Sequence, residues 1–283
     1  MKFDVIVGNP PYNPPKNFVK GPNQSIWPNF VHKSFELLAP KGFLCLVHPS
    51  AWRKPEHELW PVMTEKQIHH LRMISKKDGT AAFGAGIRVD WYVIQNTSYQ
   101  HATEIVDQDN VRTMLDIRNV KFIPSGMLDD VSTILGDDGE CFDVVLSYSS
   151  YDPRKEWMSK EQTEENIHPC IHSITSEGLR VVYSKVNDRG HFGVTKVIIN
   201  CGEILYPYND FRGEYGMTQN SFGLVIHSEQ EGNLIVAAMN TAKFKKIVAA
   251  TKWGTNAMVE WRMFKYIRRD FWRHFVDNEG NPL

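Results

Sequence analysis

Short apolar runs alternate with longer periodic stretches along the first hundred residues. Phe3–Val7 is a mainly apolar run ended by Gly8, which predicts a buried strand followed by a turn. Residues 8–24 are rich in proline and predict a loop. Ser25 is expected to cap a helix that runs to about Ala39, because large apolar side chains recur there at helical spacing.

The alternation of strands and helices continues to about residue 118. Pro40-Lys41-Gly42 should stop the first helix, because proline and glycine break regular structure. The next expected elements are a strand at Phe43–Val47, a helix over 55–67 that Pro61 kinks, and strands at Leu71–Ile74 and Val89–Gln95. This order predicts an α/β fold with a mostly parallel sheet.

The pattern changes after about residue 118, where we predict a domain boundary. The segments Leu179–Lys185, Val194–Asn200 and Ser221–His227 are rich in β-forming residues. Two stretches near 231–250 and 258–272 have helical periodicity. The predicted architecture is therefore α/β, a partial Rossmann-like sheet in residues 1–118 followed by an α+β domain in residues 119–283.

Composition is typical of a soluble globular protein. The chain has 283 residues, of which 42% are hydrophobic and 23% charged, so disorder is not expected. Its longest apolar runs are too short to cross a bilayer, and the N-terminus has no signal-peptide core. The four cysteines form no C-x-x-C pair, so we expect no metal site and a reducing, cytoplasmic setting.

Charge is uneven along the chain although the formal net charge is only −1. Residues 241–275 carry nine Lys and Arg against Glu260 and Asp270. Such a segment is either a phosphate-contact surface or a solvated helix face. The candidate cations are Lys252, Arg262, Lys265, Arg268 and Arg269.

The residues with the clearest chemistry are Asn9-Pro10-Pro11-Tyr12, directly after the first predicted strand. In an open α/β sheet such a loop lies at the carboxyl edge, where ligands bind. The Asn9 side-chain oxygen and the Pro10 carbonyl are acceptors, and the proline pair would hold them in place. Together they could bind both hydrogens of an exocyclic amine and stabilise the positive charge that develops on its nitrogen. The alternatives are a rigid turn without chemistry and a Tyr12 side chain that packs on the core.

The stretch from Phe3 to Asn13 resembles the catalytic motif of S-adenosylmethionine-dependent amino-methyltransferases, in particular DNA adenine-N6 methyltransferases of restriction-modification type. Residues 26–52 are similar to the helix, strand and proline-serine turn that follow this motif in the family. Phe83 to Ile87 resembles the later segment whose phenylalanine packs against the flipped base. The C-terminal half resembles the target-recognition region more loosely.

The resemblance implies site-specific methylation of a flipped adenine in double-stranded DNA. Asn9, Pro10, Pro11 and Tyr12 would then be catalytic, with Tyr12 and Phe83 stacking on the base. Residues 1–118 would form the catalytic-loop half of a methyltransferase domain, and residues 119–283 the target-recognition domain. The five candidate cations would contact phosphates.

The family binds S-adenosylmethionine with a glycine-rich turn upstream of this loop, yet only eight residues precede Asn9 here. Phe83-Gly84-Ala85-Gly86 fits such a turn only superficially, because no clear strand precedes it. The cofactor-binding half is therefore expected to be missing from this chain, and a separate chain would supply it. A truncated or split gene product, and a non-catalytic DNA-binding or specificity subunit, remain alternatives. So does an amino-methyltransferase that acts on RNA or on a protein glutamine.

Overall fold

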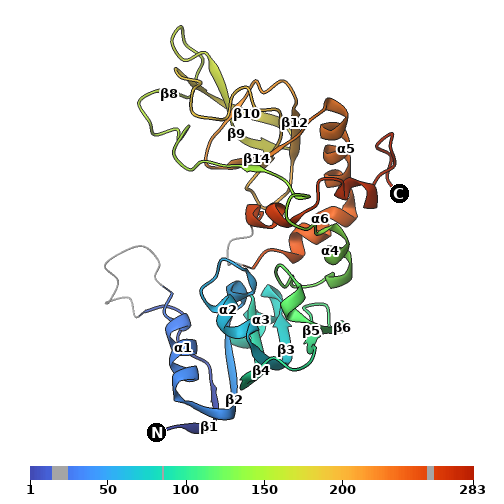
Figure 1. The fold of residues 1–283 in the computed structure, drawn as a ribbon. Helices are drawn as coiled ribbons and strands as arrows, with labels where there is room; N and C mark the ends of the chain where they lie inside the picture. Colours follow the sequence, from blue (N-terminus) through green and yellow to red (C-terminus); the bar gives the residue numbers. More distant parts are fainter. Residues whose placement is uncertain (15–24, 85, 254–257) are drawn as a thin grey trace. The chain divides into compact units, whose positions relative to one another are not determined.

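A computed structural model describes residues 1–14, 25–84, 86–253 and 258–283 (Figure 1). The chain divides into two compact units, one of residues 1–128 with Trp253 and one of residues 129–252 with 258–283. The domain limits expected from the sequence stay a prediction, and the compact units themselves divide after Leu128. Most of the predicted proline-rich loop, residues 15–24, lies outside the described residues. In the described part of the chain, no helix has the length and apolar character to cross a membrane.

The first unit is built around a six-stranded sheet in the order β1-β2-β4-β3-β5-β6. The three predicted inner strands, at 43–47, 71–74 and 89–95, are all longer than expected, because pairing with neighbours extends them beyond their apolar runs. The strands are β1 (Phe3–Gly8), β2 (Leu38–Pro49), β3 (Lys66–Ile74), β4 (Val89–Ser98), β5 (Thr103–Val106) and β6 (Arg112–Leu115). The helices are α1 (Trp27–Leu37), α2 (Leu59–Thr64) and α3 (Lys76–Phe83), with 3-10 turns η2 (Ser50–Arg53) and η3 (Ile117–Asn119).

The sheet is mixed, so the expectation of a mostly parallel sheet is wrong. β1 pairs with β2 and β3 pairs with β5 in parallel, but β4 runs antiparallel to both β2 and β3. An alternation of strands and helices does not distinguish a crossover from a return at the same end of the sheet. Here α3 connects the adjacent ends of β3 and β4, because Ile74 pairs with Val89. The chain nevertheless combines helices and sheets, as the predicted α/β class requires, and the partial Rossmann-like arrangement stays a prediction.

Two helices of this unit begin or end at other residues than the sequence predicts. The N-cap of α1 is Ile26 rather than Ser25, and it makes no side-chain capping bond. Pro28 in the first turn has a suitable fixed φ and lacks an N–H that would need a partner, which favours a start at this point. The helix expected over 55–67 is reduced to α2, because the chain enters β3 at Lys66.

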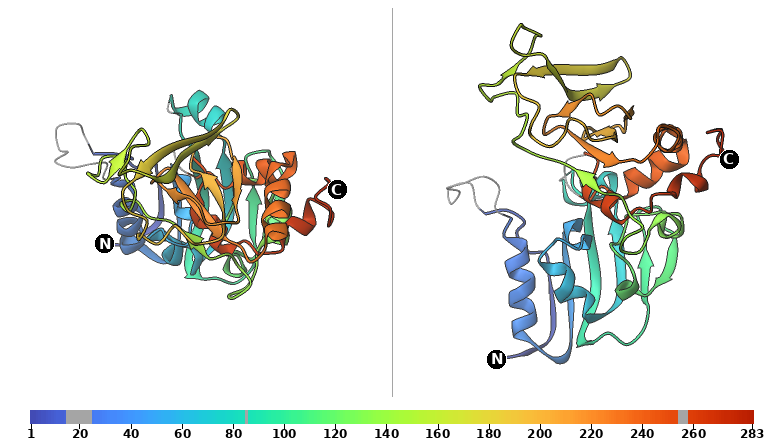
Figure 2. Two further views of the ribbon diagram at one scale, coloured as in Figure 1. Left: turned by 90° about the horizontal axis from the view of Figure 1, so that it is seen from above. Right: turned by 45° about the horizontal axis from the view of Figure 1, so that its top comes forward.

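The core of the first unit joins α1 to the middle of the sheet. Trp27 and Val31 of α1 belong to one buried cluster with Leu44, Leu46 and Trp52. Two further views show α1 alongside β1 and β2 (Figure 2). This packing fixes the start of α1 close to the carboxyl ends of both strands.

The start of β2 approaches the backbone of β1 very closely. Lys41 has a positive φ of 64°, and a Cβ on Gly42 would lie 2.9 Å from the Asp4 carbonyl oxygen and 3.1 Å from that of Phe3. The register between the two strands shifts at this place, between Phe3 and Val5. Gly42 therefore allows β1 to pair closely with β2 just before β1 leads into the loop that contains Asn9.

The second unit contains two four-stranded sheets, in the orders β13-β9-β10-β8 and β12-β11-β14-β7. The predicted strands near 179–185, 194–200 and 221–227 are confirmed as β10, β11 and β14. The bounds are β7 (Val144–Val145), β8 (Met158–Ser159), β9 (His168–Thr175), β10 (Gly178–Ser184), β11 (Lys196–Asn200), β12 (Pro207–Asp210), β13 (Gly216–Met217) and β14 (Ser221–Val225).

Helices and 3-10 turns make up the rest of this unit. They are α4 (Leu128–Ile134), α5 (Glu229–Asn240), α6 (Ala242–Ala250), η4 (Trp261–Tyr266) and η5 (Phe271–His274). The stretch near 231–250 is two helices, because the Thr241 hydroxyl caps α6 by accepting from the Phe244 N–H. The continuous helix expected over 258–272 is wrong, because Ile267 and Arg268 form β-bridges with Leu135 and Cys141.

A buried ion pair crosses the second sheet of this unit. Lys196 on β11 lies opposite Asp210 on β12, and its ammonium group is 2.6 Å from the carboxylate. The same ammonium donates to the carbonyl oxygens of His191 at 2.9 Å and Val194 at 3.1 Å. With every donor satisfied, this lysine is a structural residue of the sheet.

We predict that Gly42→Ala destabilises the first unit, because the new methyl group would meet backbone oxygens that cannot move aside. Overpacking of this kind costs about 1–3 kcal/mol. Gly8→Ala is the matched control, since its Cβ would meet only the Leu46 side chain at 3.5 Å. Urea unfolding should give a lower midpoint for Gly42→Ala than for Gly8→Ala, and equal midpoints would contradict the close approach described above.

Candidate active site

The loop after β1 presents its polar groups at the carboxyl end of the strand. Asn9 is exposed, and its side chain makes no hydrogen bond to another described residue. Pro10 is buried and Pro11 is exposed. The buried proline restrains the main chain beside Asn9, so the amide is held at the surface with its hydrogen-bonding capacity free.

Tyr12 anchors the loop to the start of α1. Its carbonyl oxygen accepts a 3.0 Å hydrogen bond from the Ile26 N–H. The side chain is half-buried and packs against the core, and its hydroxyl is buried without a partner among the described residues. Burial raises the pKa of this hydroxyl, because the charged form would lose its water. The predicted stacking of Tyr12 on a base stays a prediction.

A stack of three rings holds the start of α1 at the carboxyl end of β2. The Trp27 ring lies between His48, with a centroid separation of 4.4 Å, and His57, at 5.1 Å. His48 is fully buried, and its Nε2 is 2.8 Å from the Tyr92 hydroxyl. Its Nδ1 is 3.0 Å from the Pro49 carbonyl oxygen, so the neutral ring donates from Nδ1 and accepts at Nε2.

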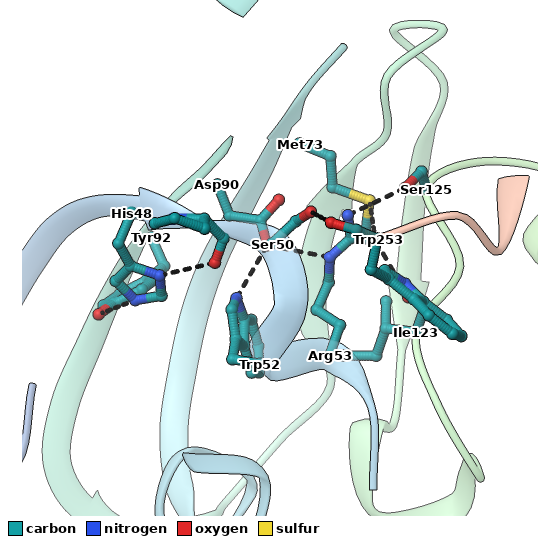
Figure 3. Close-up of polar contacts among 11 residues, drawn as sticks. His48, Ser50, Trp52, Arg53, Met73, Asp90, Tyr92, Ile123, Ser125 and Trp253 are labelled. Atoms are coloured by element: carbon teal, nitrogen blue, oxygen red, sulfur yellow. Dashed lines mark hydrogen bonds and ion pairs between the residues drawn. The ribbon is translucent and has the colours of Figure 1, made fainter. Parts of the chain in front are cut away.

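A buried carboxylate organises the turn that follows β2 (Figure 3). Asp90 Oδ2 accepts from the Trp52 indole at 2.8 Å and from Arg53 Nε at 2.9 Å. Arg53 also donates to the Ile123 carbonyl oxygen and to the Ser125 hydroxyl, both at 3.0 Å. Asp90 on β4 thus binds the turn η2 directly, and residues 123–125 join the network through Arg53.

Trp253 joins the same network from a distant part of the sequence. Its carbonyl oxygen accepts from the Ser50 hydroxyl at 2.9 Å, and its indole donates to the Ile123 carbonyl oxygen at 2.8 Å. Sequence reasoning missed the pairing of Arg53 with Asp90. The available signal was Asp90 itself, a charged residue inside an apolar strand that must find a partner when buried.

Phe83 lies at the end of α3 and is 40% exposed. Its predicted stacking on a base stays a prediction. Gly84 follows with a φ of 66° and ends the helix in the left-handed conformation. The described part of residues 83–86 therefore follows a helix rather than a strand and does not fit a cofactor-binding turn. Ala85 lies outside the described residues.

Most of the candidate cations of the second unit already have partners. Lys252 is only 8% exposed, and its ammonium group donates to the Glu203 carbonyl oxygen. The guanidinium groups of the three arginines pair with acids, Arg262 with Glu260, Arg268 with Asp270 and Arg269 with Glu231. Lys265 is exposed and lies 5.1 Å from the ring centroid of Trp261. Their roles as phosphate contacts stay predictions.

Comparison with known proteins finds similarity to restriction-modification methylases over part of the chain. Residues 1–78 match the family model described as Eco57I restriction-modification methylase. No curated protein sequence matches the chain. The fold is similar to the Type IIL restriction-modification enzyme MmeI, solved in complex with DNA, with a TM-score of 0.53 and 8% identity over 93% of this chain and 45% of that one.

Other solved chains match with lower scores. The DrdV–DNA complex matches with a TM-score of 0.40 and 9% identity, over 92% of this chain and 42% of that one. The M protein of the Type I restriction enzyme EcoKI matches with a TM-score of 0.28 and 12% identity, over 49% and 36%. The chain spans less than half the length of the solved chains that it matches.

We predict that His48 makes the first unit less stable in acid. Burial lowers its pKa from 6.5 to about 3, because the charged ring would be desolvated. Between pH 6.5 and about 3 the His48 ring is protonated in the unfolded chain but neutral in the folded chain. The free energy of unfolding therefore falls as the pH drops toward 3. The slope from this one group approaches about 1.4 kcal/mol per pH unit.

The measurement is urea unfolding at a series of pH values for the natural protein and for His48→Gln. The variant removes the titrating ring, so its stability should depend less on pH over this range than that of the natural protein. Parallel stability curves for the two proteins would refute the assignment of this pH dependence to His48.

Proposed function

We propose that this chain is the catalytic-loop and target-recognition part of a DNA adenine-N6 methyltransferase that uses S-adenosylmethionine. The observation that carries the proposal is the exposed Asn9 amide, held without a partner among the described residues at the carboxyl end of β1. The match of residues 1–78 to a restriction-modification methylase family supports it. The known DNA complex of MmeI, whose fold is similar, makes duplex DNA the first substrate to test.

In the proposed reaction the loop binds the exocyclic amine of a flipped adenine. The Asn9 side-chain oxygen and the Pro10 carbonyl oxygen each accept one of the two N6 hydrogens. As the nitrogen takes up a carbon it becomes positively charged, and two fixed dipoles stabilise that charge without reorganising. S-adenosylmethionine, when bound, would supply the methyl group as its sulfonium carbon–sulfur bond breaks and a neutral thioether leaves. The nitrogen would then lose a proton to water. Tyr12 and Phe83 are the candidates for stacking on the extruded base.

The proposal includes a separate chain that carries the cofactor-binding half. Within the described residues, β1 pairs only with β2, so its other edge is open. Phe3, Val5 and Val7 on this strand are 41%, 58% and 72% exposed. Together with Phe30 and Leu37 of α1 they line a groove of about 400 Å³.

An apolar open edge of this kind favours a further strand beside β1. Parallel strands usually have both faces covered, and exposed edges are normally protected by charges or short length. Gly84 fits a cofactor-binding turn poorly, which also supports a cofactor site formed by residues other than 83–86. The same poor fit favours the second candidate function, a non-catalytic DNA-binding or specificity subunit.

We predict that Asn9→Ala lowers methyl transfer by about 10²–10³-fold, the usual effect of removing one preorganised polar group from a reacting centre. DNA binding should be nearly unchanged, because phosphate contacts dominate affinity. The measurement is transfer of labelled methyl groups to duplex DNA, RNA and protein substrates, with the cofactor-binding half present. Asn29→Ala, which truncates an exposed amide on α1, is the control. Equal loss of binding and transfer would count against the role of Asn9, and preferred transfer to RNA or protein would reassign the substrate.

We predict that the isolated chain binds no S-adenosylmethionine and that the mixture with its cofactor-binding partner does. The physical reason is that Gly84 ends a helix rather than following a strand and does not fit a turn that would hold the cofactor. Titration calorimetry with S-adenosylmethionine measures both, using as partner the product of the neighbouring upstream reading frame. Binding by the isolated chain would contradict the need for a second half. No binding by chain and partner together would favour the non-catalytic function.

A further inference from the structure

Arg88 lies at the end of the sheet where β1 and β2 finish, the same end as the candidate catalytic loop. It directly precedes β4, whose first residue Val89 pairs with Pro49 at the carboxyl end of β2. The Arg88 carbonyl oxygen accepts from the Ser50 N–H at 3.2 Å. Because β1 and β2 are parallel, Arg88 lies beyond the strand ends on the side where the chain leaves β1 for Asn9.

Within the described ranges of the chain the Arg88 side chain has no hydrogen-bond or ion-pair partner, which distinguishes it from every other arginine. Each of the others forms an ion pair with an acid or, for Arg72, hydrogen bonds to Asp107 and Asn110. Among the described residues, no group accepts a hydrogen bond from Arg88, and its Nε is buried. Its terminal nitrogens are not among the buried atoms without partners, so the end of the half-buried side chain reaches the surface.

The nearest acid in the strand does not pair with Arg88. Asp90, two residues further along β4, directs Oδ2 to Arg53 and Trp52, and its Oδ1 is buried without a hydrogen-bond partner among the described residues. The guanidinium groups of Arg53 and Arg88 both lie near the Asp90 carboxylate, and only that of Arg53 forms an ion pair with it. This leaves a local excess of one positive charge at the sheet edge, held on a side chain whose stem is packed.

A half-buried guanidinium without a partner is suited to an anion. Desolvation makes an unpaired charge costly, and a charge-assisted hydrogen bond offsets that cost. The planar fork of arginine matches the oxygens of a phosphate better than a point charge does. Burial also lowers the pKa of Arg88, although arginine remains charged at neutral pH.

We propose that Arg88 binds a backbone phosphate of the DNA strand that carries the target base. This inference rests on the proposed function and adds to it a phosphodiester contact beside the catalytic loop. β2 separates β1 from β4 in the sheet, so strand spacing puts Arg88 about 10 Å to the side of the loop. A flipped nucleotide extends from base through sugar to phosphate, and so it can reach both places.

The test compares Arg88→Met, which keeps the packed stem and removes the charge, with Arg88→Lys, which keeps the charge. Binding of the full chain to a fluorescein-labelled DNA duplex is measured by anisotropy over a series of NaCl concentrations. The natural chain should lose affinity with salt, and Arg88→Met should flatten the slope of log K against log salt by about 0.9, the contribution of one phosphate contact. Affinity at low salt should fall about tenfold.

Arg88→Lys should retain most of the slope, because it keeps the charge. Arg112→Met is the matched control, because Arg112 is exposed on β6 and already pairs with Glu104 at 2.6 Å. Its slope should equal that of the natural chain. Thermal unfolding of each variant identifies any loss of fold. If Arg88→Met unfolds, Arg88→Gln takes its place, because it also removes the charge, and an unchanged slope for it would overturn the proposal.

The outcomes separate this inference from the proposed function. Unchanged slopes for Arg88→Met, with DNA bound by the natural chain, overturn the phosphate contact and leave the proposed function standing. An unchanged slope with weaker binding of S-adenosylmethionine to chain and partner would assign the anion to the cofactor carboxylate, which also overturns it. No binding of duplex DNA by the natural chain under any salt condition contradicts the proposed function itself.

Discussion

The buried carboxylate of Asp90 is the interaction on which the candidate site depends. It accepts from Trp52 and Arg53, and Arg53 then reaches Ile123 and Ser125. One carboxylate thereby connects β4 with the turn after β2 and with a segment that precedes the second unit. Removing either member of such a buried pair leaves an uncompensated charge, which typically costs about 3–5 kcal/mol.

The loop with Asn9 and the turn with Ser50 lie at the same end of the sheet because β1 and β2 run parallel. Parallel strands end on the same side, so the loop with Asn9 and the turn with Ser50 share one edge of the sheet. Packing then restrains both loops. The ring stack of Trp27 with His48 and His57 holds the start of α1, and the Ile26 N–H holds Tyr12. A rigid loop of this kind suits chemistry that relies on fixed acceptors.

The two edges of the six-stranded sheet are protected to different degrees. β6 is four residues long and begins with Arg112, which pairs with Glu104. β1 is longer, and the side chains of Phe3, Val5 and Val7 are exposed. Charges and short length are the usual protection of an edge, and β1 has a single charge, Asp4. The contrast is consistent with a strand that has a partner in the working protein.

The sequence by itself determined the local features. It predicted the strand Phe3–Val7 and the strands of the second unit, because apolar periodicity acts over a few residues. The expectation that the first strand is buried is wrong, because in the described chain it pairs on one side only and exposes Phe3, Val5 and Val7. Contacts between distant residues decided the rest. Charge counting could not show that Lys252 is buried or that Arg268 and Arg269 pair with acids, since their partners lie elsewhere in the fold. It also could not single out Arg88, because only the folded structure shows that Arg53 pairs with Asp90 while Arg88 has no hydrogen-bond partner among the described residues.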